Sequence, residues 1–301
     1  MIFENMIHMQ LMMFLFIGVG YYVRKKGIVG TEGRMNMIDL CLKVTLPFNV
    51  FHSFLREWDW NLFVLCGMIL LLSVGFNLLA ILFSAVLYRR EEEKKQKTLR
   101  YGTIISNSGF LGNPMVEGIY GSDGLLYASL FMLPVRIVMW TIGIAVFLKG
   151  KKNALWKNVL TNPCIVAIYL GVIAMLFRVQ FPTFLQNTIT GISNCNTPIS
   201  MMLIGMMLAE VNPKGLIDKT VVFYTAIRLL MIPAVVFVLT MPISIDPMLR
   251  GITVIMAGMP APITTALLSA KYGGDEKYAT GMIFISTIGS MITLPLWCLL
   301  L

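Results

Sequence analysis

Four ionisable side chains lie inside apolar stretches that are long enough to cross a lipid bilayer: Lys43, Glu117, Arg136 and Arg228. A charge at bilayer depth costs roughly 2.5 to 3.5 kcal/mol on insertion scales, so each needs a partner, a cavity or a place near the interface. Arg136 is the first candidate to bind a carboxylate, because a guanidinium can donate two parallel hydrogen bonds to it. A structural pair with Glu117 or with a backbone carbonyl is the alternative.

Glu117 is the candidate for a proton-coupling carboxyl group, since it follows Pro114 by one helical turn and lies at bilayer depth. An electrostatic role at the start of a helix is the alternative. Lys43 lies four residues after Asp39, so the two can pair on one helix face, and direct contact of Lys43 with a substrate is the other reading. We interpret Arg228 as mainly structural.

Two of the apolar stretches are interrupted by residues that break helices. Residues 107–114 read Asn-Ser-Gly-Phe-Leu-Gly-Asn-Pro, and residues 258–262 read Gly-Met-Pro-Ala-Pro. Non-helical backbone at bilayer depth is tolerated only where it is packed in protein or lines a cavity. We expect a half-helix after each break, with Pro114 in the first turn behind an Asn113 cap and Pro262 at the matching position. Two helix N-termini would then converge and favour an anion.

The candidate substrate site takes residues from both breaks and from the predicted fifth span. They are Asn107, Ser108, Gly112, Asn113, Pro114, Arg136, Pro260, Pro262, Thr264 and Thr265. Glu117, Asp39 and Lys43 are the candidates for coupling or support. The five cysteines are scattered singly through apolar spans, so we expect no metal site, no disulfide and no cofactor.

The elements that position these residues are transmembrane helices. The chain is 57% hydrophobic and 13% charged, with a mean hydropathy of +0.79, which excludes an ordinary soluble protein. Ten apolar runs can each span the roughly 30 Å of hydrocarbon. They lie near residues 6–23, 35–55, 61–88, 101–120, 125–148, 158–177, 184–208, 221–242, 248–272 and 278–300. The predicted fold class is therefore an all-α membrane protein.

The two halves of the chain repeat each other. Residues 120–123, Tyr-Gly-Ser-Asp, return at 272–275 as Tyr-Gly-Gly-Asp, and a similar offset takes Pro47 to Pro198. We expect a first five-helix repeat over 1–148, a short basic cytoplasmic linker over 149–157 and a second repeat over 158–301. Because five is odd, the repeats must be inverted, and such repeats in lipid are typical of transporters.

Lysine and arginine predict the orientation of the chain. Loops on one face carry 18 of these residues and loops on the other face carry three. Since cytoplasmic loops retain positive charge, both termini should lie outside the cytoplasm of a multi-pass cell-membrane protein. The net charge of +9 then reflects the orientation of the chain in the membrane rather than binding of nucleic acid. We expect no cleavable signal peptide, because no basic region precedes the first apolar run.

At these breaks the sequence resembles the auxin efflux carrier family, which includes the plant PIN-formed carriers and many short bacterial proteins. Residues 107–114 are similar to its first crossover motif, and Met259-Pro260-Ala261 with residues 271–275 to its second. Leu46-Pro47 and Thr197-Pro198 match as well, so the resemblance covers the whole chain. Thr264 stands where many members have Asn, and Arg136 where bacterial relatives often have a neutral polar residue.

The resemblance implies a fold like that of bile acid and sodium/proton transporters, with crossed broken helices 4 and 9. Spans 1, 2, 6 and 7 would form a scaffold, and spans 3–5 and 8–10 a mobile transport domain. It also implies export of a small organic anion, a mono- or dicarboxylate, by elevator-type alternating access. We expect protons as a possible coupling ion and a homodimer in the membrane.

Other functions remain open at this point. Sodium-coupled uptake of the bile acid type would need several oxygen ligands at the crossover, where Glu117 is the single carboxylate. An intramembrane enzyme would need a general base near Ser108, but the two histidines lie at span ends, so we expect no enzyme. A sensor or a channel explains fewer of these features than a transporter does.

Overall fold

The computed structural model describes residues 2–55, 60–147, 161–210 and 218–301, and every regular element among them is helical. This agrees with the predicted all-α class. The described chain divides into two compact units. Unit 1 comprises residues 1–67, 113–130 and 157–210, and unit 2 comprises residues 68–112, 131–156 and 211–301. The predicted linker over 149–157 lies outside the described residues.

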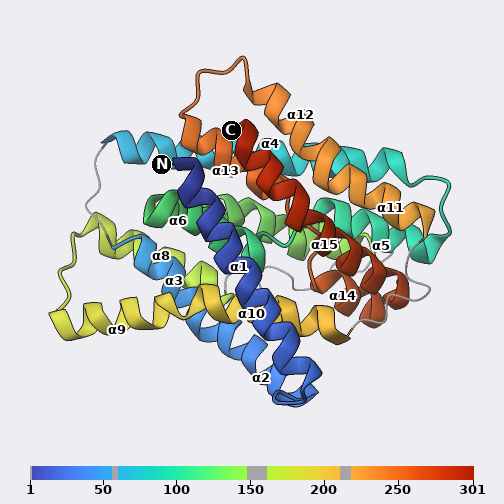
Figure 1. The fold of residues 1–301 in the computed structure, drawn as a ribbon. Coiled ribbons are helices and arrows are strands. Elements are labelled where there is room, and N and C mark those ends of the chain that lie inside the picture. Colours follow the sequence, from blue (N-terminus) through green and yellow to red (C-terminus); the bar gives the residue numbers. More distant parts are fainter. Residues whose placement is uncertain (1, 56–59, 148–160, 211–217) are drawn as a thin grey trace. The chain divides into compact units, whose positions relative to one another are not determined.

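Unit 1 contains the long helix α1 and a group of shorter helices. Its elements are α1 (Ile2–Lys25), α2 (Thr31–Leu40), α3 (Leu46–Ser53), α8 (Pro163–Leu176), α9 (Thr183–Asn194) and α10 (Asn196–Glu210), with the start of α4 and residues 113–130 of α6. α1 packs along α10 (Figure 1), and α3 packs on α8 and α9.

Two glycines set the close approach of α1 and α10. A Cβ atom on Gly20 would collide with the backbone of Met202, and one on Gly205 would collide with the backbone of Ile17. Small residues at such crossings let helix backbones approach closely, which is how membrane helices gain packing energy without a hydrophobic driving force. At the end of this pair, Glu210 accepts from Arg24 Nε at 2.7 Å and lies 2.9 Å from Arg34 Nε.

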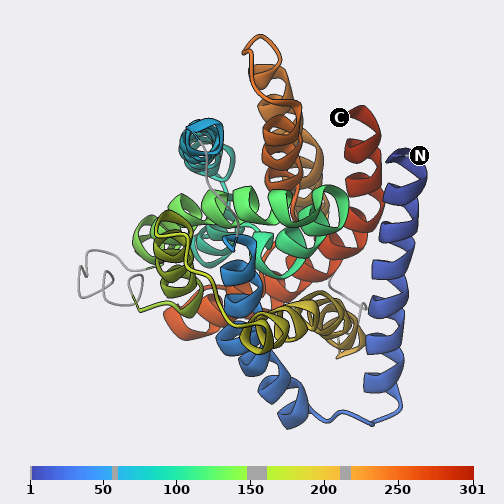
Figure 2. The same ribbon diagram turned by 90° about the vertical axis from the view of Figure 1, so that its left-hand side faces the viewer.

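Unit 2 holds most of α4 (Trp60–Leu87) and all of α5 (Glu93–Ile104), together with the end of α6 (Asn113–Val138). Its other helices are α11 (Lys219–Ala226), α12 (Ile232–Thr240), α13 (Pro247–Ala257), α14 (Thr264–Tyr272) and α15 (Glu276–Leu300). Figure 2 shows α12 and α13 side by side, joined by a loop at one end. α15 packs against α11, α14 and α5.

Three helices begin just after a wide π-helical turn, and each carries a proline in its own first turn. The turns are Cys41–Thr45, Ser108–Gly112 and Ile227–Met231, ahead of Pro47, Pro114 and Pro233. Proline has no N–H and crowds the carbonyl four residues earlier, so the helix widens there. The carbonyl freed by Pro233 is that of Leu229, which accepts from Trp297 Nε1 at 2.8 Å.

The glycine of the repeated Tyr-Gly motif has a positive φ in both halves, but its ψ differs: −156° at Gly121 and 32° at Gly273. Gly121 has a φ of 67° and interrupts α6, while Gly273 has a φ of 75° and ends α14 in the left-handed conformation. Glycine reaches this region without steric cost. Asp275 then caps α15, with its carboxylate accepting from the N–H of Tyr278 at 2.9 Å.

Among the described residues, five helical stretches are long and apolar enough to cross a membrane. They are Trp60–Leu87, Glu93–Gly143, Thr183–Glu210, Lys219–Thr240 and Glu276–Leu300, with Pro163–Leu176 and Pro247–Ala257 as shorter apolar helices. The stretch Glu93–Gly143 has 51 residues and contains two predicted spans, separated by the bend at Gly121. The helices are thus those of a membrane protein, and the count of ten spans stays a prediction.

Candidate functional site

The first break lies earlier than the sequence predicts. α5 ends at Ile104, Ile105 is extended with ψ of 137°, and the helical path resumes at Ser108. The carbonyl of Asn107 accepts from the N–H groups of Leu111 and Gly112 at 3.1 and 3.2 Å. The expectation that Asn113 caps the new half-helix is therefore wrong. Gly112 before it is already helical, because the π-helical turn accommodates Pro114.

The second break is an extended stretch between two helices. α13 ends at Ala257, and α14 begins at Thr264. Pro262 lies two residues ahead of α14 rather than in its first turn, and its carbonyl accepts from the N–H of Thr265 at 2.9 Å. Residues 258–262 of this stretch are buried, and the N–H of Ala261 donates to Ser286 Oγ of the same unit at 3.0 Å.

A backbone hydrogen bond joins the two breaks inside unit 2. The N–H of Asn107 donates to the carbonyl oxygen of Pro260 at 2.8 Å. A buried backbone group without a partner is costly, so two stretches that have lost their helical partners are stabilised by pairing with each other. Beside this bond, Ser106 and Ser108 share a 2.5 Å hydrogen bond, and Ser108 Oγ lies 3.5 Å from the carbonyl of Met256.

Arg228 is fully buried and contacts backbone in or beside both breaks. Its Nε donates to the carbonyl of Met259 at 3.0 Å, and its Nη1 donates to the carbonyl of Thr103 at 3.4 Å. The guanidinium also stacks over the ring of Phe76 at 5.7 Å. A buried guanidinium that serves two backbone carbonyls agrees with the structural role expected for Arg228 from the sequence.

The two threonines of α14 differ in their surroundings. Thr264 Oγ1 accepts from Tyr101 Oη at 2.9 Å, so this hydroxyl is engaged within unit 2. Thr265 is fully buried, and its Oγ1 has no hydrogen-bond partner among the described residues. Buried polar groups normally have a partner, so an unpartnered one beside a break marks a place for a ligand or a water molecule.

Arg136 lies beside the first break in unit 2. Its Nη2 atom is 3.8 Å from the position that a Cβ atom on Gly109 would occupy. Gly109 belongs to the π-helical turn Ser108–Gly112, so the guanidinium faces backbone without a side chain. Among the described residues, Arg136 has no hydrogen bond or ion pair. The alternative partner Glu117 belongs to unit 1, and that pair stays a prediction.

Unit 1 contains the predicted residues Asn113, Pro114 and Glu117. Asn113 is buried, and its Oδ1 has no hydrogen-bond partner among the described residues. Asn49 Nδ2 donates to the two carboxylate oxygens of Glu117 at 3.0 and 3.3 Å, and Thr197 Oγ1 donates to one of them at 3.2 Å. Neutral donors therefore surround the carboxylate of Glu117.

The polar network that continues from Glu117 was not predicted from the sequence. Asn49 also donates to Ser193 Oγ at 3.2 Å and accepts from Asn196 Nδ2 at 3.3 Å. Thr45 Oγ1 lies 3.4 Å from Asn196 Oδ1. The usable signal was the repeat, because the offset that takes Pro47 to Pro198 also takes Thr45 to Asn196.

Asp39 and Lys43 pair with each other at 2.6 Å on one face of the helix, and both side chains are exposed. An exposed pair at this spacing contributes a few tenths of a kcal/mol at most. Nothing in this geometry brings them to Glu117.

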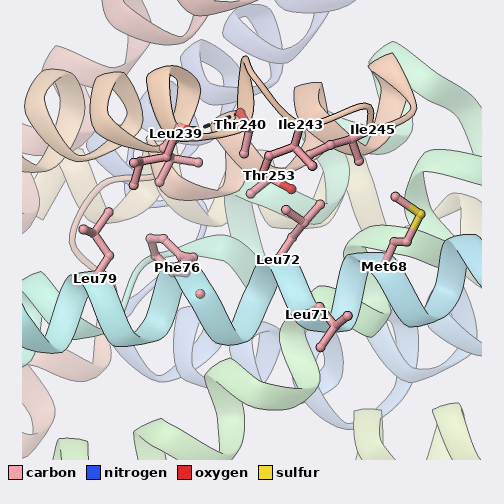
Figure 3. Close-up of a pocket in the computed structure, with 12 residues that line it drawn as sticks. Met68, Leu71, Leu72, Phe76, Leu79, Leu239, Thr240, Ile243, Ile245 and Thr253 are labelled. Carbon is pink, nitrogen blue, oxygen red and sulfur yellow. Dashed lines mark hydrogen bonds between the residues drawn. The ribbon is translucent and has the colours of Figure 1, made fainter.

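An apolar cavity of about 400 Å³ in unit 2 does not suit an anion. Figure 3 shows Leu72, Phe76 and Leu79 of α4 facing Leu239 and Ile243 across it. Its two hydroxyl groups, on Thr240 and Thr253, donate to carbonyls of their own helices at 2.9 and 2.7 Å. The polar groups near the two breaks are therefore the better candidate site.

Helical units with paired interior breaks define a polytopic membrane protein, and comparison with known proteins defines its family. The profile of the family described as "Membrane transport protein" matches residues 2–298, so the chain belongs to that family. It is 27% identical over 312 residues to an uncharacterized transporter of Methanothermobacter thermautotrophicus, covering 100% of both chains. The predicted resemblance is confirmed.

Two further relatives carry functional names. Auxin efflux carrier component 7 of Arabidopsis thaliana is 26% identical over 152 residues, which is 48% of this chain and 24% of the carrier. A putative malonate transporter of Rhizobium meliloti is 21% identical over 237 residues, which is 74% of each protein. The chain is therefore a membrane transporter of the family that contains auxin efflux carriers.

Proposed function

We propose that this transporter exports a small organic anion, a mono- or dicarboxylate, by elevator-type alternating access. The observation that carries the proposal is the hydrogen bond from Asn107 to Pro260, which joins the two breaks in unit 2. Malonate, named for one relative, is a dicarboxylate. The membrane in this proposal is the cell membrane, with both termini outside the cytoplasm.

The electrostatics near the breaks support an anionic substrate. Arg136 has a guanidinium with no partner among the described residues, next to the bare backbone at Gly109. Asn113 Oδ1 and Thr265 Oγ1 are buried polar atoms without partners there. A carboxylate would accept from the guanidinium of Arg136 and from the hydroxyl of Thr265, both in unit 2.

The division of the chain supports an elevator. Residues 1–55 and 161–210, which contain predicted spans 1, 2, 6 and 7, fall in unit 1, and predicted spans 8 to 10 fall in unit 2. The departures are residues 61–67 and 113–130, which belong to predicted spans 3 to 5 but group with unit 1. In our proposal unit 2 carries the crossover, and the contacts of residues 113–130 with unit 1 change during transport.

We propose protons as the coupling ion, acting at Glu117. Its hydrogen-bond partners Asn49 Nδ2 and Thr197 Oγ1 both donate to it, whereas a sodium site would present several acceptor oxygens to the ion. Both donors are neutral, so they hydrogen-bond to the carboxylate of Glu117 without the strong preference for its charged form that a neighbouring cation would cause. Sodium-coupled symport of the bile acid type remains the competing function, and a sensor or an enzyme is the competing class.

The test is a flux assay with the purified protein in liposomes. Radiolabelled malonate and an aromatic carboxylate are offered under a proton gradient, a sodium gradient or neither. We expect flux above protein-free vesicles that follows the proton gradient and is unchanged when sodium is withdrawn. Glu117→Gln should lose the response to the proton gradient, whereas Glu32→Gln, an exposed carboxyl on α2, should keep it.

Three results would overturn parts of this proposal. Flux that depends on the sodium gradient and not on the proton gradient would identify the protein as the sodium-coupled symporter. An unchanged proton response in Glu117→Gln removes Glu117 from coupling. Absence of flux for every carboxylate, in protein that is folded by thermal melting, contradicts transport of organic anions.

A further inference from the structure

A cavity with one charged wall lies beside α5 in unit 2. Its volume is about 580 Å³, which is in the range of small-molecule sites. Four residues of α5 form one wall: Glu93, Gln96, Lys97 and Arg100. The last three follow Glu93 by three, four and seven residues, so all four side chains share one face of the helix.

This wall carries a positive charge, on Arg100, that pairs with no acidic side chain in the described part of the chain. Lys97 Nζ lies 3.0 Å from Glu93 Oε1, so these two charges offset each other. Gln96 Nε2 donates to the carbonyl of Tyr88 at 2.7 Å and is occupied. Arg100 Nε is buried and has no hydrogen-bond partner among the described residues. A desolvated guanidinium N–H without an acceptor calls for an anionic ligand.

The opposite wall is apolar. Ile142, Ala145 and Val146 line it, and Ile142 is 41% exposed. Directly after Arg100 the same two segments are in close contact, because the rings of Tyr101 and Phe147 are 5.5 Å apart. The cavity is therefore the open end of a packed helix pair. A ligand that fills it must carry an anionic group on one side and an apolar body on the other.

The position of the cavity along the chain indicates the source of that ligand. Arg100 immediately precedes the predicted span that begins at Tyr101, so the cavity lies at the level of the lipid headgroups, whichever face is cytoplasmic. Anionic phospholipids are concentrated at this depth and attract clusters of Lys and Arg.

We propose that this cavity binds the headgroup of an anionic phospholipid, with Arg100 donating to its phosphate and Ile142 and Val146 contacting the glycerol and the start of an acyl chain. The bound lipid bridges α5 and the segment Met139–Phe147. Since α5 leads directly into the first break, the lipid stabilises the unit that holds Asn107 and Pro260. This inference does not depend on the identity of the transported anion.

The test uses the full chain in a neutral detergent and measures the melting temperature against added dihexanoyl phosphatidylglycerol or dihexanoyl phosphatidylcholine. Binding to the folded state raises the melting temperature with ligand concentration. We expect a saturable rise with phosphatidylglycerol and a much smaller one with phosphatidylcholine. Arg100→Gln should raise the half-saturating concentration about 10-fold or more. Arg90→Gln, an exposed arginine outside the cavity, should leave it unchanged.

A second variant keeps the proposal testable if Arg100→Gln does not fold. Ala145 is exposed on the apolar wall, so Ala145→Leu fills the cavity with little disturbance to the core, and it should abolish the saturable response. Equal responses to the two lipids, or an unchanged half-saturating concentration in folded Arg100→Gln and Ala145→Leu, would overturn the proposal. So would protection by a soluble carboxylate such as malonate that competes with phosphatidylglycerol.

Discussion

The backbone N–H of Asn107 donates a 2.8 Å hydrogen bond to the carbonyl oxygen of Pro260, and each residue comes from a different half of the chain. Both lie where a membrane helix is interrupted, so neither group has a helical partner. The bond explains how two interruptions can persist in an apolar environment: each supplies the partner that the other lacks. Residues that hold this pair should therefore matter for folding, and residues that surround it without partners should matter for binding.

Arg228 should be essential for stability. Arg228→Lys keeps the charge, but an ammonium on a flexible stem cannot reproduce the planar fork that serves Met259 and Thr103. Leaving buried carbonyls unpartnered costs roughly 1 to 3 kcal/mol each. We expect Arg228→Lys to lower the melting temperature in detergent by many degrees. Arg89→Lys is the control, because Arg89 is exposed and donates to a carbonyl of its own helix. Equal melting temperatures would contradict the structural role.

The crossing of α1 and α10 gives a second stability prediction. Gly20→Ala places a methyl group against the backbone of Met202, so the helices must move apart and packing is lost. Gly18→Ala, two residues away on the same helix, meets nothing within 4 Å. We expect Gly20→Ala to destabilise by about 1 to 3 kcal/mol and Gly18→Ala to be neutral or slightly stabilising. Thermal melts of the two variants side by side check the crossing.

Replacing Asn113 should impair transport while leaving folding nearly unchanged. Its Oδ1 is buried and has no partner among the described residues, so Asn113→Ala removes an unsatisfied group and should cost little stability. If the amide binds substrate, flux should fall by about 10-fold or more. Ser129→Ala is the control, because Ser129 is buried in α6 and bonds only to the carbonyl of Leu125 in its own helix. Wild-type flux in Asn113→Ala would remove Asn113 from the site.

Orientation can be measured directly. The loop asymmetry of 18 Lys and Arg residues to three predicts that both termini lie outside the cytoplasm and the linker 149–157 inside. In a background without cysteines, one Cys at the N-terminus should react with an impermeant maleimide in intact cells. One Cys in the linker should react only after the cells are opened. The reverse pattern would invert the topology and the direction of each half-helix.

The sequence identified the breaks because Gly, Asn and Pro act locally on the backbone. It misplaced the helix start near Asn113 because a π-helical turn depends on how the carbonyls freed by Pro114 find partners, which a residue pattern does not encode. It missed the network of Asn49, Ser193 and Asn196 around Glu117, since Asn49 lies in predicted span 2 and the other two in predicted span 7, and these spans meet only in the folded unit. Ordinary polar residues in apolar helices carry no motif.

Arg136 is the residue that we expect to contribute most to binding of the carboxylate substrate. Losing a charge-assisted hydrogen bond costs about 1.5 to 3 kcal/mol, so Arg136→Gln should weaken carboxylate binding by roughly 10- to 150-fold. Arg136→Lys should recover only part of the affinity, because the bidentate fork is lost. If Arg136 instead pairs with Glu117, the double variant Arg136→Gln with Glu117→Gln should restore both stability and binding.

The most direct measurement is the affinity of the purified transporter for a carboxylate such as malonate, determined by calorimetry together with the melting temperature, for wild type, Arg136→Gln and Arg136→Lys. We expect that wild type binds, that Arg136→Gln melts like wild type but binds at least about 10-fold more weakly, and that Arg136→Lys falls between them. Unchanged affinity in a stable Arg136→Gln variant would contradict the placement of the anion beside the first break.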